Sequence, residues 1–541
     1  MGRLLIPLET RDVKNALPLY PVAGKQPAGS ASSPSEGNPQ VPSDSFSSSS
    51  REVPEKATPI KLTILHTNDL HGAMLPSEVR DKEGNMVSRG GESYISSVIS
   101  QARAEASPNC LLLDAGDLAQ GSPLSDASRG ASMVEIMGRE GYDATVVGNH
   151  DLEWGIKPLQ DMASHSSFPF LAANMSDIQS GQPLSGVQPY IIKELNDLKV
   201  GIVGVTTPEI RDITTSDEVQ KLSIASPEEI LQKTIPQMKR EGADVIVVLS
   251  HNGLARDKEI ASKVKGIDVI IGGHSHLETE QPLKVGDTVI VQAGCKGAKV
   301  GRLDIEIDPS TKKVLGANGK LLLVDQTRIA PDPEISGVVD KYRNLLDSDL
   351  SESLGEARVD ITNSNKRESN MGDFLTDIMR KRTGADFALL NSGGIRSNIY
   401  AGRISGSDIY NAMPFASRLV TVNLTGADIK ALLERSAEQE NEVLQVSGMK
   451  VVMDSSRPGG ERVVSVQTEN GKSLDPDKVY SVATIDYLAR RGGHFQVFKN
   501  FQNLRYDESM FDVVKESIKA LGTIDPVISG RIQDLKETPQ K

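Results

Sequence analysis

The sequence predicts an α/β fold that is divided into two domains. At 541 residues the chain is too long for one hydrophobic core. From residue 60 onward, short apolar runs alternate with helical stretches, which is typical of α/β proteins. Asp, His or Asn follows directly after several of these runs, so a functional site is expected where the predicted strands end.

Composition limits the classes of partner. The chain has 60 basic and 73 acidic residues, a formal charge of −13, and no Lys/Arg-rich run. These values argue against binding to nucleic-acid polymers or anionic membranes, but they allow a local basic pocket for a phosphate group. Cys110 and Cys295 permit at most one intramolecular disulfide, and their apolar surroundings predict two buried free thiols instead.

The N-terminal segment is expected to be a disordered arm over residues 1–58. Pro, Ser, Gly and charged residues dominate residues 26–58, which have almost nothing to bury. The apolar run Met1–Leu8 is too short for a secretory signal and is broken by Pro7, and Ile6 stands where a myristoylation motif needs Ser or Thr. An export signal is therefore absent from this form of the chain, or there was never one. No stretch reaches the roughly 18 apolar residues of a membrane helix.

Seven apolar runs form the predicted strands of the first domain. Five of them are followed by Asp, His or Asn. These residues would meet at the carboxyl edge of an open α/β sheet. The runs cover residues 62–65, 110–113, 144–147, 200–205, 245–249, 269–271 and 288–292.

Histidine usage strengthens this interpretation. The chain has only eight histidines, and five of them lie in these loops: His71, His150, His251, His274 and His276. Taken singly, each loop could be an ordinary turn, and Asp69 with His71 alone would be weak support for a site. Five such loops in one domain are not expected of core or random surface histidines.

Two divalent cations about 3.5 to 4 Å apart suit these residue types, and such a pair hydrolyses phosphate esters by in-line displacement. A shared carboxylate must bridge the cations, and Asp117 is well placed in the series for that role. His150, beside the candidate ligand Asn149, could stabilise the transition state or protonate the leaving group. Glu153 could orient His150.

A second domain is predicted after the first. Residues 59–330 form the first domain, and Pro331–Asp349 is expected to form a helix within a connector and hinge at residues 331–352. A new α/β pattern runs from residue 353 to 535, before a short tail at residues 536–541. Its apolar segments cover residues 374–379, 387–390, 420–424, 429–434, 449–453 and 480–484.

The motifs of both domains resemble those of the 5′-nucleotidase family, which includes UDP-sugar hydrolases and 2′,3′-cyclic-nucleotide phosphodiesterases. The resemblance rests on His66–Gly72, Leu113–Asp117, Gly148–Asp151, Ser250–Gly253 and Gly272–His276 in the first domain, and on Asn370–Gly372, Asn391–Arg396, Pro414–Phe415 and Gln445–Gly448 in the second. It implies a calcineurin-like metallophosphoesterase β-sandwich with flanking helices, plus a C-terminal α/β substrate-binding domain.

The resemblance also implies roles for single residues. One metal ion would be bound by Asp69, His71, Asp117 and His276, and the other by Asp117, Asn149, His251 and His274. His150 would be the catalytic histidine, with Glu153 beside it, and Arg396 would bind the substrate phosphate. Further substrate contacts are expected from Asn391, Gly394 and Tyr487. The family's second domain rotates between open and closed states.

Three departures from the family concern the substrate. Glu153 stands where many members have Asp and the cyclic-nucleotide members have Asn. Tyr487 matches one of two aromatic residues that sandwich the base, whereas Val443 occupies the place expected for the other, at a cost on the order of 1 kcal/mol. In the loop at residues 487–495 the ribose-binding Asp is absent, with Gly493 or His494 in its place, and two arginines, Arg490 and Arg491, add positive charge at the pocket mouth.

The expected function is hydrolysis of phosphate esters by two metal ions, as in a 5′-nucleotidase acting on nucleotides. Mn²⁺ and Zn²⁺ both suit these ligands. A 2′,3′-cyclic-nucleotide phosphodiesterase with 3′-nucleotidase activity and a UDP-sugar hydrolase are alternatives, and a thiosulfohydrolase or a non-catalytic binding protein is less favoured. A small-molecule partner, a monomer or homodimer, and a periplasmic or extracellular location follow from the resemblance.

Overall fold

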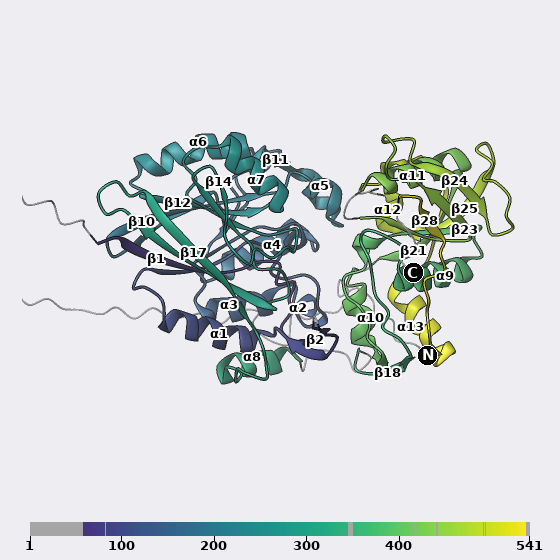
Figure 1. Cartoon of the computed structure of the whole chain (residues 1–541), viewed down its shortest axis with the longest axis horizontal. Coiled ribbons are helices and arrows are strands. Elements are labelled where there is room, and N and C mark those ends of the chain that lie inside the picture. Colours follow the sequence, from purple (N-terminus) through teal and green to yellow (C-terminus); the bar gives the residue numbers. More distant parts are fainter. Residues whose placement is uncertain are drawn as a thin grey trace, which may run out of the picture.

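A computed structural model of the chain describes residues 58–81, 83–343, 350–415, 417–439, 442–490, 492 and 494–536. The arm predicted for residues 1–58 therefore lies almost wholly outside the described residues, as do Arg491 and Gly493. Two lobes lie side by side, with the first domain on the left of Figure 1 and the second on the right. Within the described parts of the chain, no helix combines the length and apolar character needed to cross a membrane.

The first domain is built on two stacked sheets. The seven-stranded sheet has the order β17 (Val314–Leu323), β16 (Lys299–Ile307), β1 (Ile60–Thr67), β4 (Cys110–Asp114), β5 (Ala144–Val146), β6 (Phe170–Leu171) and β8 (Val187–Gln188). The six-stranded sheet has the order β14 (Leu283–Val285), β15 (Thr288–Val291), β13 (Val269–Gly272), β12 (Val245–His251), β10 (Leu198–Thr206) and β9 (Tyr190–Leu195).

Side-chain alternation explains why the sheets stack. In β1, Leu62 and Ile64 point into the core between the sheets, whereas Leu65 points into a core beneath helices. In β12, Val247 joins the central core and Val248 joins the core on the other side. Strands that are apolar on both faces must be covered on both faces. Here the other sheet covers one face of each sheet.

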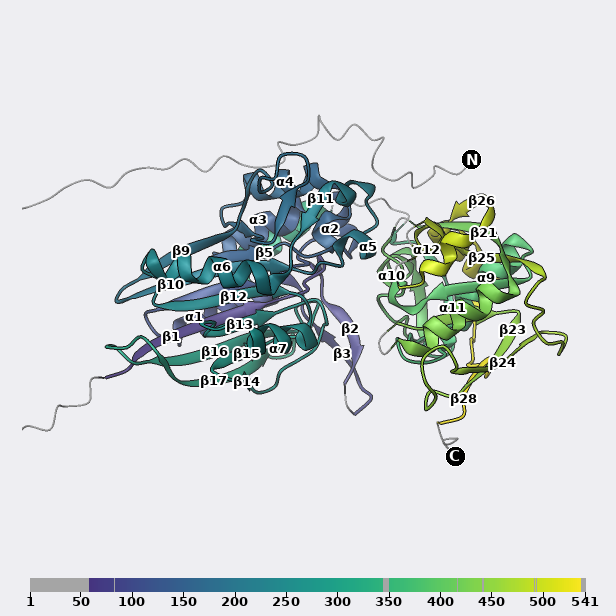
Figure 2. The same cartoon turned by 90° about the horizontal axis from the view of Figure 1, so that it is seen from above.

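Helices complete the layers of the first domain. The outer face of the seven-stranded sheet is covered by α1 (Glu92–Ala104), α3 (Ala131–Glu140), α4 (Ile156–His165) and α8 (Pro333–Arg343), and that of the six-stranded sheet by α6 (Pro227–Arg240) and α7 (Leu254–Lys263). Figure 1 shows the layers from top to bottom as α6 and α7, the two sheets, and then α1, α3 and α8, and Figure 2 shows the same layers seen from above. The predicted sandwich is confirmed. The prediction of a single open sheet, which the strand pattern suggested, is wrong, because the seven predicted strands are divided between two sheets.

The connector helix packs on the first domain. α8 covers most of the helix predicted between residues 331 and 349, and it buries Ile335, Val338, Val339 and Tyr342 in the core beneath α1 and α3. Residues 344–349 of the predicted connector and hinge are outside the described part of the chain. The domain boundaries and the hinge stay predictions.

The second domain has a central sheet with the order β22 (Leu444–Ser447), β19 (Phe387–Asn391), β25 (Val479–Ile485), β21 (Arg418–Thr425) and β26 (Gln502–Ser509). Its helices are α9 (Asn370–Thr383), α10 (Gly406–Ala412), α11 (Gly426–Glu438), α12 (Asp486–Arg490) and α13 (Met510–Leu521). Two small sheets, β20 (Gly402–Ser405), β18 (Ser353–Ala357) and β27 (Thr523–Ile524), and β24 (Val463–Thr468), β23 (Met449–Met453) and β28 (Ile532–Asp534), flank it. Two of the predicted apolar segments lie in helices, α9 and α11, and the other four lie in strands.

Candidate metal centre and active site

The candidate site lies where strands from both sheets end. β1, β4 and β5 of one sheet lead into the loops that carry Asp69, His71, Asp117 and Asn149, and β12 and β13 of the other lead to His251, His274 and His276. Backbone hydrogen bonds join the loops, since Asp69 N–H donates to Gly116 O and His71 N–H donates to Asp117 O, both at 2.9 Å. The seven candidate ligands therefore converge from two sheets.

Backbone strain is concentrated on these ligands. Asp69, His71, Asp117, His274 and His276 have φ values between 50° and 72°, in the left-handed region that residues other than glycine rarely adopt. Such conformations cost on the order of 1 to 3 kcal/mol each, and they persist where the surrounding structure fixes them. The loops hold these side chains inward at the expense of stability.

Asp69, His71 and His276 form the first group of ligands, with one donor atom of each lying within 4.8 Å of the others. The Nε2 atoms of His71 and His276 are 3.0 Å apart, and His276 Nε2 is 3.6 Å from Asp69 Oδ1. Burial lowers the pKa of both imidazoles well below its ordinary value. Two neutral nitrogens facing one carboxylate are a donor set that fits a divalent cation.

Asp117, His251 and His274 form the second group. Asn149 Oδ1 completes it, at 3.2 Å from His251 Nε2 and 3.0 Å from His274 Nδ1. Asp117 Oδ2 lies 3.1 Å from His251 Nε2 and 3.9 Å from His71 Nε2, so this carboxylate stands between the two groups. That position suits a bridging ligand.

Backbone carbonyls orient two of the imidazoles. His71 Nδ1 lies 2.9 Å from Gln120 O, and His251 Nδ1 lies 2.8 Å from Ala115 O. A carbonyl oxygen only accepts, so each Nδ1 donates and each Nε2 is the nitrogen that faces the site. This outer contact is the usual way in which a ligating histidine is fixed.

His150 lies beside the candidate ligands without belonging to either group. Its Nδ1 is 2.8 Å from Glu153 Oε1, and its ring centroid is 5.2 Å from that of His71. Glu153 Oε2 accepts from Thr215 N–H at 2.9 Å and also from the Thr215 hydroxyl. The structure therefore holds the predicted histidine and glutamate as a hydrogen-bonded pair, although their catalytic role stays a prediction.

Arg396 reaches the metal groups from the second domain. Its guanidinium NH2 lies 3.4 Å from His71 Nε2, and its NH1 donates to Gly393 O at 3.4 Å. The contact is supported by Lys296, whose Nζ donates to Arg396 O at 3.0 Å while its own N–H donates to Asp69 O at 2.8 Å. A cation of one domain is thereby placed over the metal loops of the other.

The other predicted substrate residues lie around Arg396. Asn391 ends β19, and its Nδ2 donates to Glu442 Oε1 at 2.6 Å. A Cβ atom on Gly394 would lie 3.3 Å from Asn391 Oδ1, so this glycine lies against Asn391. His494, one of the two candidates for the missing Asp, has its Nε2 3.6 Å from Glu442 Oε2.

The interpretation of Val443 as a lost stacking face is wrong. Val443 is only 6% exposed, and its N–H donates to Ser392 Oγ at 3.0 Å, so the residue belongs to the interior. A pocket of about 110 Å³ between the domains is lined by Phe415 and Tyr487, with Thr215, Asp217, Ser417, Asp486 and Arg490. Phe415 stacks on His150 at 5.6 Å between ring centroids, and Tyr487 OH donates to Asp212 O at 3.2 Å. Two aromatic side chains, those of Phe415 and Tyr487, therefore line this pocket.

Some residues inside the sequence motifs have roles that the motifs alone did not reveal. Asp151 is fully buried and accepts from the backbone N–H groups of Asp117, Leu118 and Gly148. Asn68 Nδ2 donates to Asp69 Oδ2 at 2.7 Å. Both residues shape the ligand loops, and their adjacency to predicted ligands was the available signal.

Comparison with known proteins agrees with this geometry. Residues 62–278 match the family described as calcineurin-like phosphoesterase, and residues 349–500 match the 5′-nucleotidase C-terminal domain. The chain is 33% identical to a human 5′-nucleotidase over 529 residues, which are 87% of this chain and 91% of that protein. The chain belongs to the 5′-nucleotidase family. It is a metal-dependent phosphoric ester hydrolase, as the sequence predicted.

Solved structures of this family have the same fold. A 5′-nucleotidase precursor of Thermus thermophilus superposes with a TM-score of 0.83 at 30% identity, covering 88% of this chain and 100% of that one. A sulfate thiohydrolase of the same organism has a TM-score of 0.78 at 21% identity, covering 89% of this chain and 98% of that one. The second likeness concerns the fold alone. The match to the calcineurin-like phosphoesterase family implies divalent metal ions, and the two donor groups agree with it.

Proposed function

We propose that this 5′-nucleotidase family member removes the 5′-phosphate of nucleoside monophosphates with the help of two divalent cations. The observation that carries the proposal is the approach of Arg396 in the second domain to His71 in the first, at 3.4 Å. A guanidinium beside a metal ligand is suited to bind the phosphate that the metal site must process.

The two donor groups would hold the cations, with Asp117 shared between them. When bound, the cations supply positive charge that polarises the phosphoryl oxygens and lowers the pKa of water. Mn²⁺ and Zn²⁺ suit the mixture of imidazole and carboxylate ligands. The protein's part is to hold the imidazoles and carboxylates in place before the cations bind.

His150 serves the reacting phosphate directly in this proposal. Its Nδ1 donates to Glu153, so its Nε2 is the atom that can face a substrate oxygen. An imidazole in that position stabilises the charge that develops on the phosphoryl group or gives a proton to the leaving 5′-oxygen. Glu153, held by Thr215, keeps the ring oriented.

The nucleoside would occupy the pocket between Phe415 and Tyr487. The stacking of Phe415 on His150 places this pocket directly beside the proposed catalytic histidine. An aromatic pair of this kind binds the faces of a planar base. Asn391 and Glu442 lie on the Arg396 side, where they can bind polar groups of the sugar.

A substrate screen tests the proposal. The purified chain is assayed with Mn²⁺, Zn²⁺ and Mg²⁺ against nucleoside 5′-monophosphates, 3′-monophosphates, 2′,3′-cyclic nucleotides and UDP-sugars. Metal-dependent release of phosphate from the 5′-monophosphates is the expected result. Turnover of cyclic nucleotides or UDP-sugars alone would replace the proposal by one of those alternatives, and no metal-dependent turnover of any phosphate ester would refute it.

Quaternary state and location are also proposals. A monomer or homodimer is expected, and light scattering after size-exclusion chromatography distinguishes the two. A periplasmic or extracellular location is supported by the similarity of this chain to a snake venom 5′-nucleotidase, to which it is 30% identical over 526 residues. Fractionation of the source cells, with activity assayed in each fraction, tests it.

A further inference from the structure

A second cleft continues from the proposed base pocket. It has a volume of about 590 Å³ and lies between α5 (Ile210–Ile213) and η4 (Asp217–Lys221) of the first domain and α12 and η7 (Gln496–Asn500) of the second. Asp217 and Arg490 line both the pocket and this cleft. The path from the metals therefore runs past His150 and Phe415, between the aromatic pair, and past Arg490 into the larger space.

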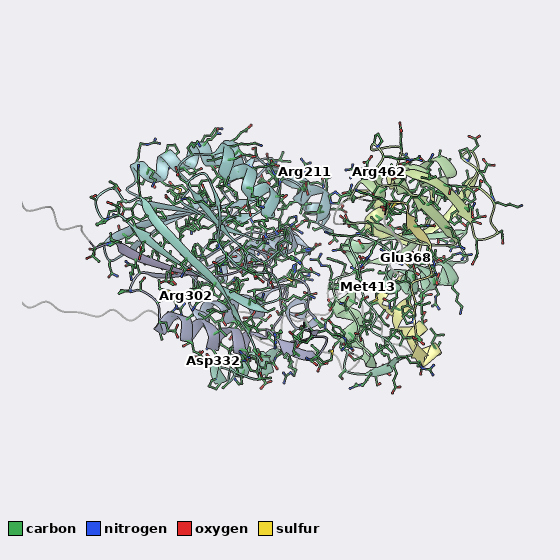
Figure 3. The ribbon with its side chains drawn as sticks, viewed as in Figure 1. Arg211, Arg302, Asp332, Glu368, Met413 and Arg462 are labelled. Carbon is green, nitrogen blue, oxygen red and sulfur yellow. The ribbon has the colours of Figure 1, made fainter. Side chains whose placement is uncertain are left out.

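Three cations line the larger cleft. Arg211 comes from the first domain, and Arg490 and Lys499 come from the second. Figure 3 shows Arg211 on the side of the first domain that is turned toward the second domain. The lining includes two carboxylates, Asp212 and Asp217, so the cations exceed the anions by one.

Neighbouring side chains hold both arginines of the cleft lining. The Arg490 guanidinium lies over the ring of Tyr506, 5.9 Å from its centroid, and such a contact uses the flat face of the guanidinium. The N–H groups lie in the plane of the guanidinium, so this contact does not use them. Arg211 NH2 donates to Gln220 Oε1 at 3.2 Å, which helps to orient this side chain. Phe501 and Leu504 give the cleft an apolar wall.

We infer that this cleft binds an anionic substituent on the outer edge of the base, so that the enzyme accepts nucleoside 5′-monophosphates whose base carries carboxylates. The inference rests on the proposed function, because the phosphate must lie at the metals and the base between Phe415 and Tyr487. An unsubstituted base ends near Arg490 and leaves the cleft unused. A carboxylate-bearing chain of a few atoms would extend past Arg490 toward Arg211 and Lys499.

The reaction itself is unchanged by such a substrate. Water adds to phosphorus, the bond between phosphorus and the 5′-oxygen breaks, and the substituted nucleoside leaves with a proton on that oxygen. The cleft therefore affects binding and selectivity rather than the chemical step. Because the three cations are solvent-exposed, the gain depends on ionic strength.

Three substrates of graded size and charge provide the test. They are AMP, N6-butyl-AMP as a neutral extended analogue, and N6-(1,2-dicarboxyethyl)-AMP as the anionic one. The measured quantity is the ratio of kcat/KM for the anionic analogue to that for the neutral analogue, at low salt and at high salt. We expect a ratio of about ten at low salt, since each exposed charge pair contributes a factor of a few.

Charge-removing variants make the test specific. Lys499→Gln and Arg211→Gln should each lower the ratio by about threefold, and the double variant should bring it close to one. Lys472→Gln, which removes an exposed lysine in the turn after β24 and outside both clefts, is the matched control and should leave the ratio unchanged.

The outcomes separate the inference from the function on which it rests. A ratio near one in the wild-type enzyme, or a ratio that persists in the double variant, overturns the inference while hydrolysis of AMP upholds the proposed function. Failure to hydrolyse all three nucleotides overturns the proposed function itself. A ratio that falls with salt and with the double variant supports the inference.

Discussion

His150 Nδ1 lies 2.8 Å from Glu153 Oε1, although glutamate is one methylene longer than the aspartate that the resemblance to the family leads us to expect at this position. The extra length is accommodated because Thr215 anchors the second carboxylate oxygen through its N–H and its hydroxyl. The short helix η3 (His150–Leu152) brings the two residues onto one side, three positions apart. The substitution therefore preserves the histidine–carboxylate pair.

His150→Ala should lower kcat by about 10²- to 10⁴-fold, because it removes a group that stabilises or protonates the leaving oxygen. The metal content should stay at the wild-type level, since His150 belongs to neither ligand group. Steady-state kinetics and metal analysis by mass spectrometry check both statements. Asp117→Ala and Asn149→Ala are the controls and should lose metal as well as activity. Equal metal loss in His150→Ala would show that His150 is a ligand.

Glu153→Gln should be milder than His150→Ala, with a loss of about tenfold in kcat. The amide oxygen can still accept from His150 Nδ1, but a neutral amide forms a weaker hydrogen bond than a carboxylate and orients the ring less firmly. The split between kcat and KM distinguishes this role from a merely structural one, because kcat should fall while KM and the metal content stay at their wild-type values. An unchanged kcat together with a lowered melting temperature would contradict the positioning role.

Arg396→Ala should raise KM for nucleotides by about 10- to 100-fold, as expected for loss of a charge-assisted hydrogen bond. Arg396→Lys keeps the charge but not the two-pronged geometry, so it should recover only part of the affinity. Inhibition by inorganic phosphate provides a second readout, and its Ki should rise in parallel with KM. A change in kcat alone, with KM and Ki unchanged, would argue against binding of the substrate phosphate by Arg396.

The metal-ligand loops could be predicted because their chemistry is local. Asp69 and His71 lie two positions apart after an apolar run, and the ends of such strands meet in space whether or not they share a sheet. The division of those strands between two sheets was not predictable from alternation alone. In β1, the adjacent residues Ile64 and Leu65 are both apolar and point to opposite faces, and a helix or a second sheet can cover either face equally well.

Contacts between the domains were harder to predict than the ligands. Lys296 and Arg396 are 100 positions apart, and their hydrogen bond depends on how two separately folded units dock. Tyr410 OH likewise donates to Asp126 Oδ2 at 2.8 Å across 284 positions. The misplacement of the second aromatic residue is related, because Phe415 lines a pocket that also includes Thr215 and Asp217 of the first domain, and only the docked domains show this.

Phe415→Ala and Tyr487→Ala should each raise KM for AMP by about tenfold, through loss of stacking and of buried aromatic area. Hydrolysis of a small substrate without a base, such as ribose 5-phosphate, should change much less. Val443→Phe is the second variant of this test. Val443 is only 6% exposed, so a phenylalanine there would overpack the interior and would not place its ring in the pocket. Tighter binding of AMP by Val443→Phe would contradict the assignment of Phe415 as the second face.

Glu92 is a carboxyl group buried in the first domain with no hydrogen-bond partner for either oxygen among the described residues. Burial, with Asp114 nearby, raises its pKa to about 8. A carboxyl group whose pKa is higher in the folded state than in the unfolded state binds more protons when folded. It therefore lowers the free energy of unfolding as the pH rises from the ordinary carboxyl value toward 8.

Glu92→Gln should accordingly leave the melting temperature almost unchanged at pH 5 and raise it by about 3 °C at pH 8, because the neutral amide has no proton to lose. Thermal unfolding followed by circular dichroism at several pH values between 5 and 8 measures the effect. Glu306→Gln, at an exposed position of β16, is the matched control and should not change the pH dependence. If Glu92→Gln and Glu306→Gln have the same stability profile as the wild-type protein, Glu92 releases its proton in the folded state as easily as in the unfolded state.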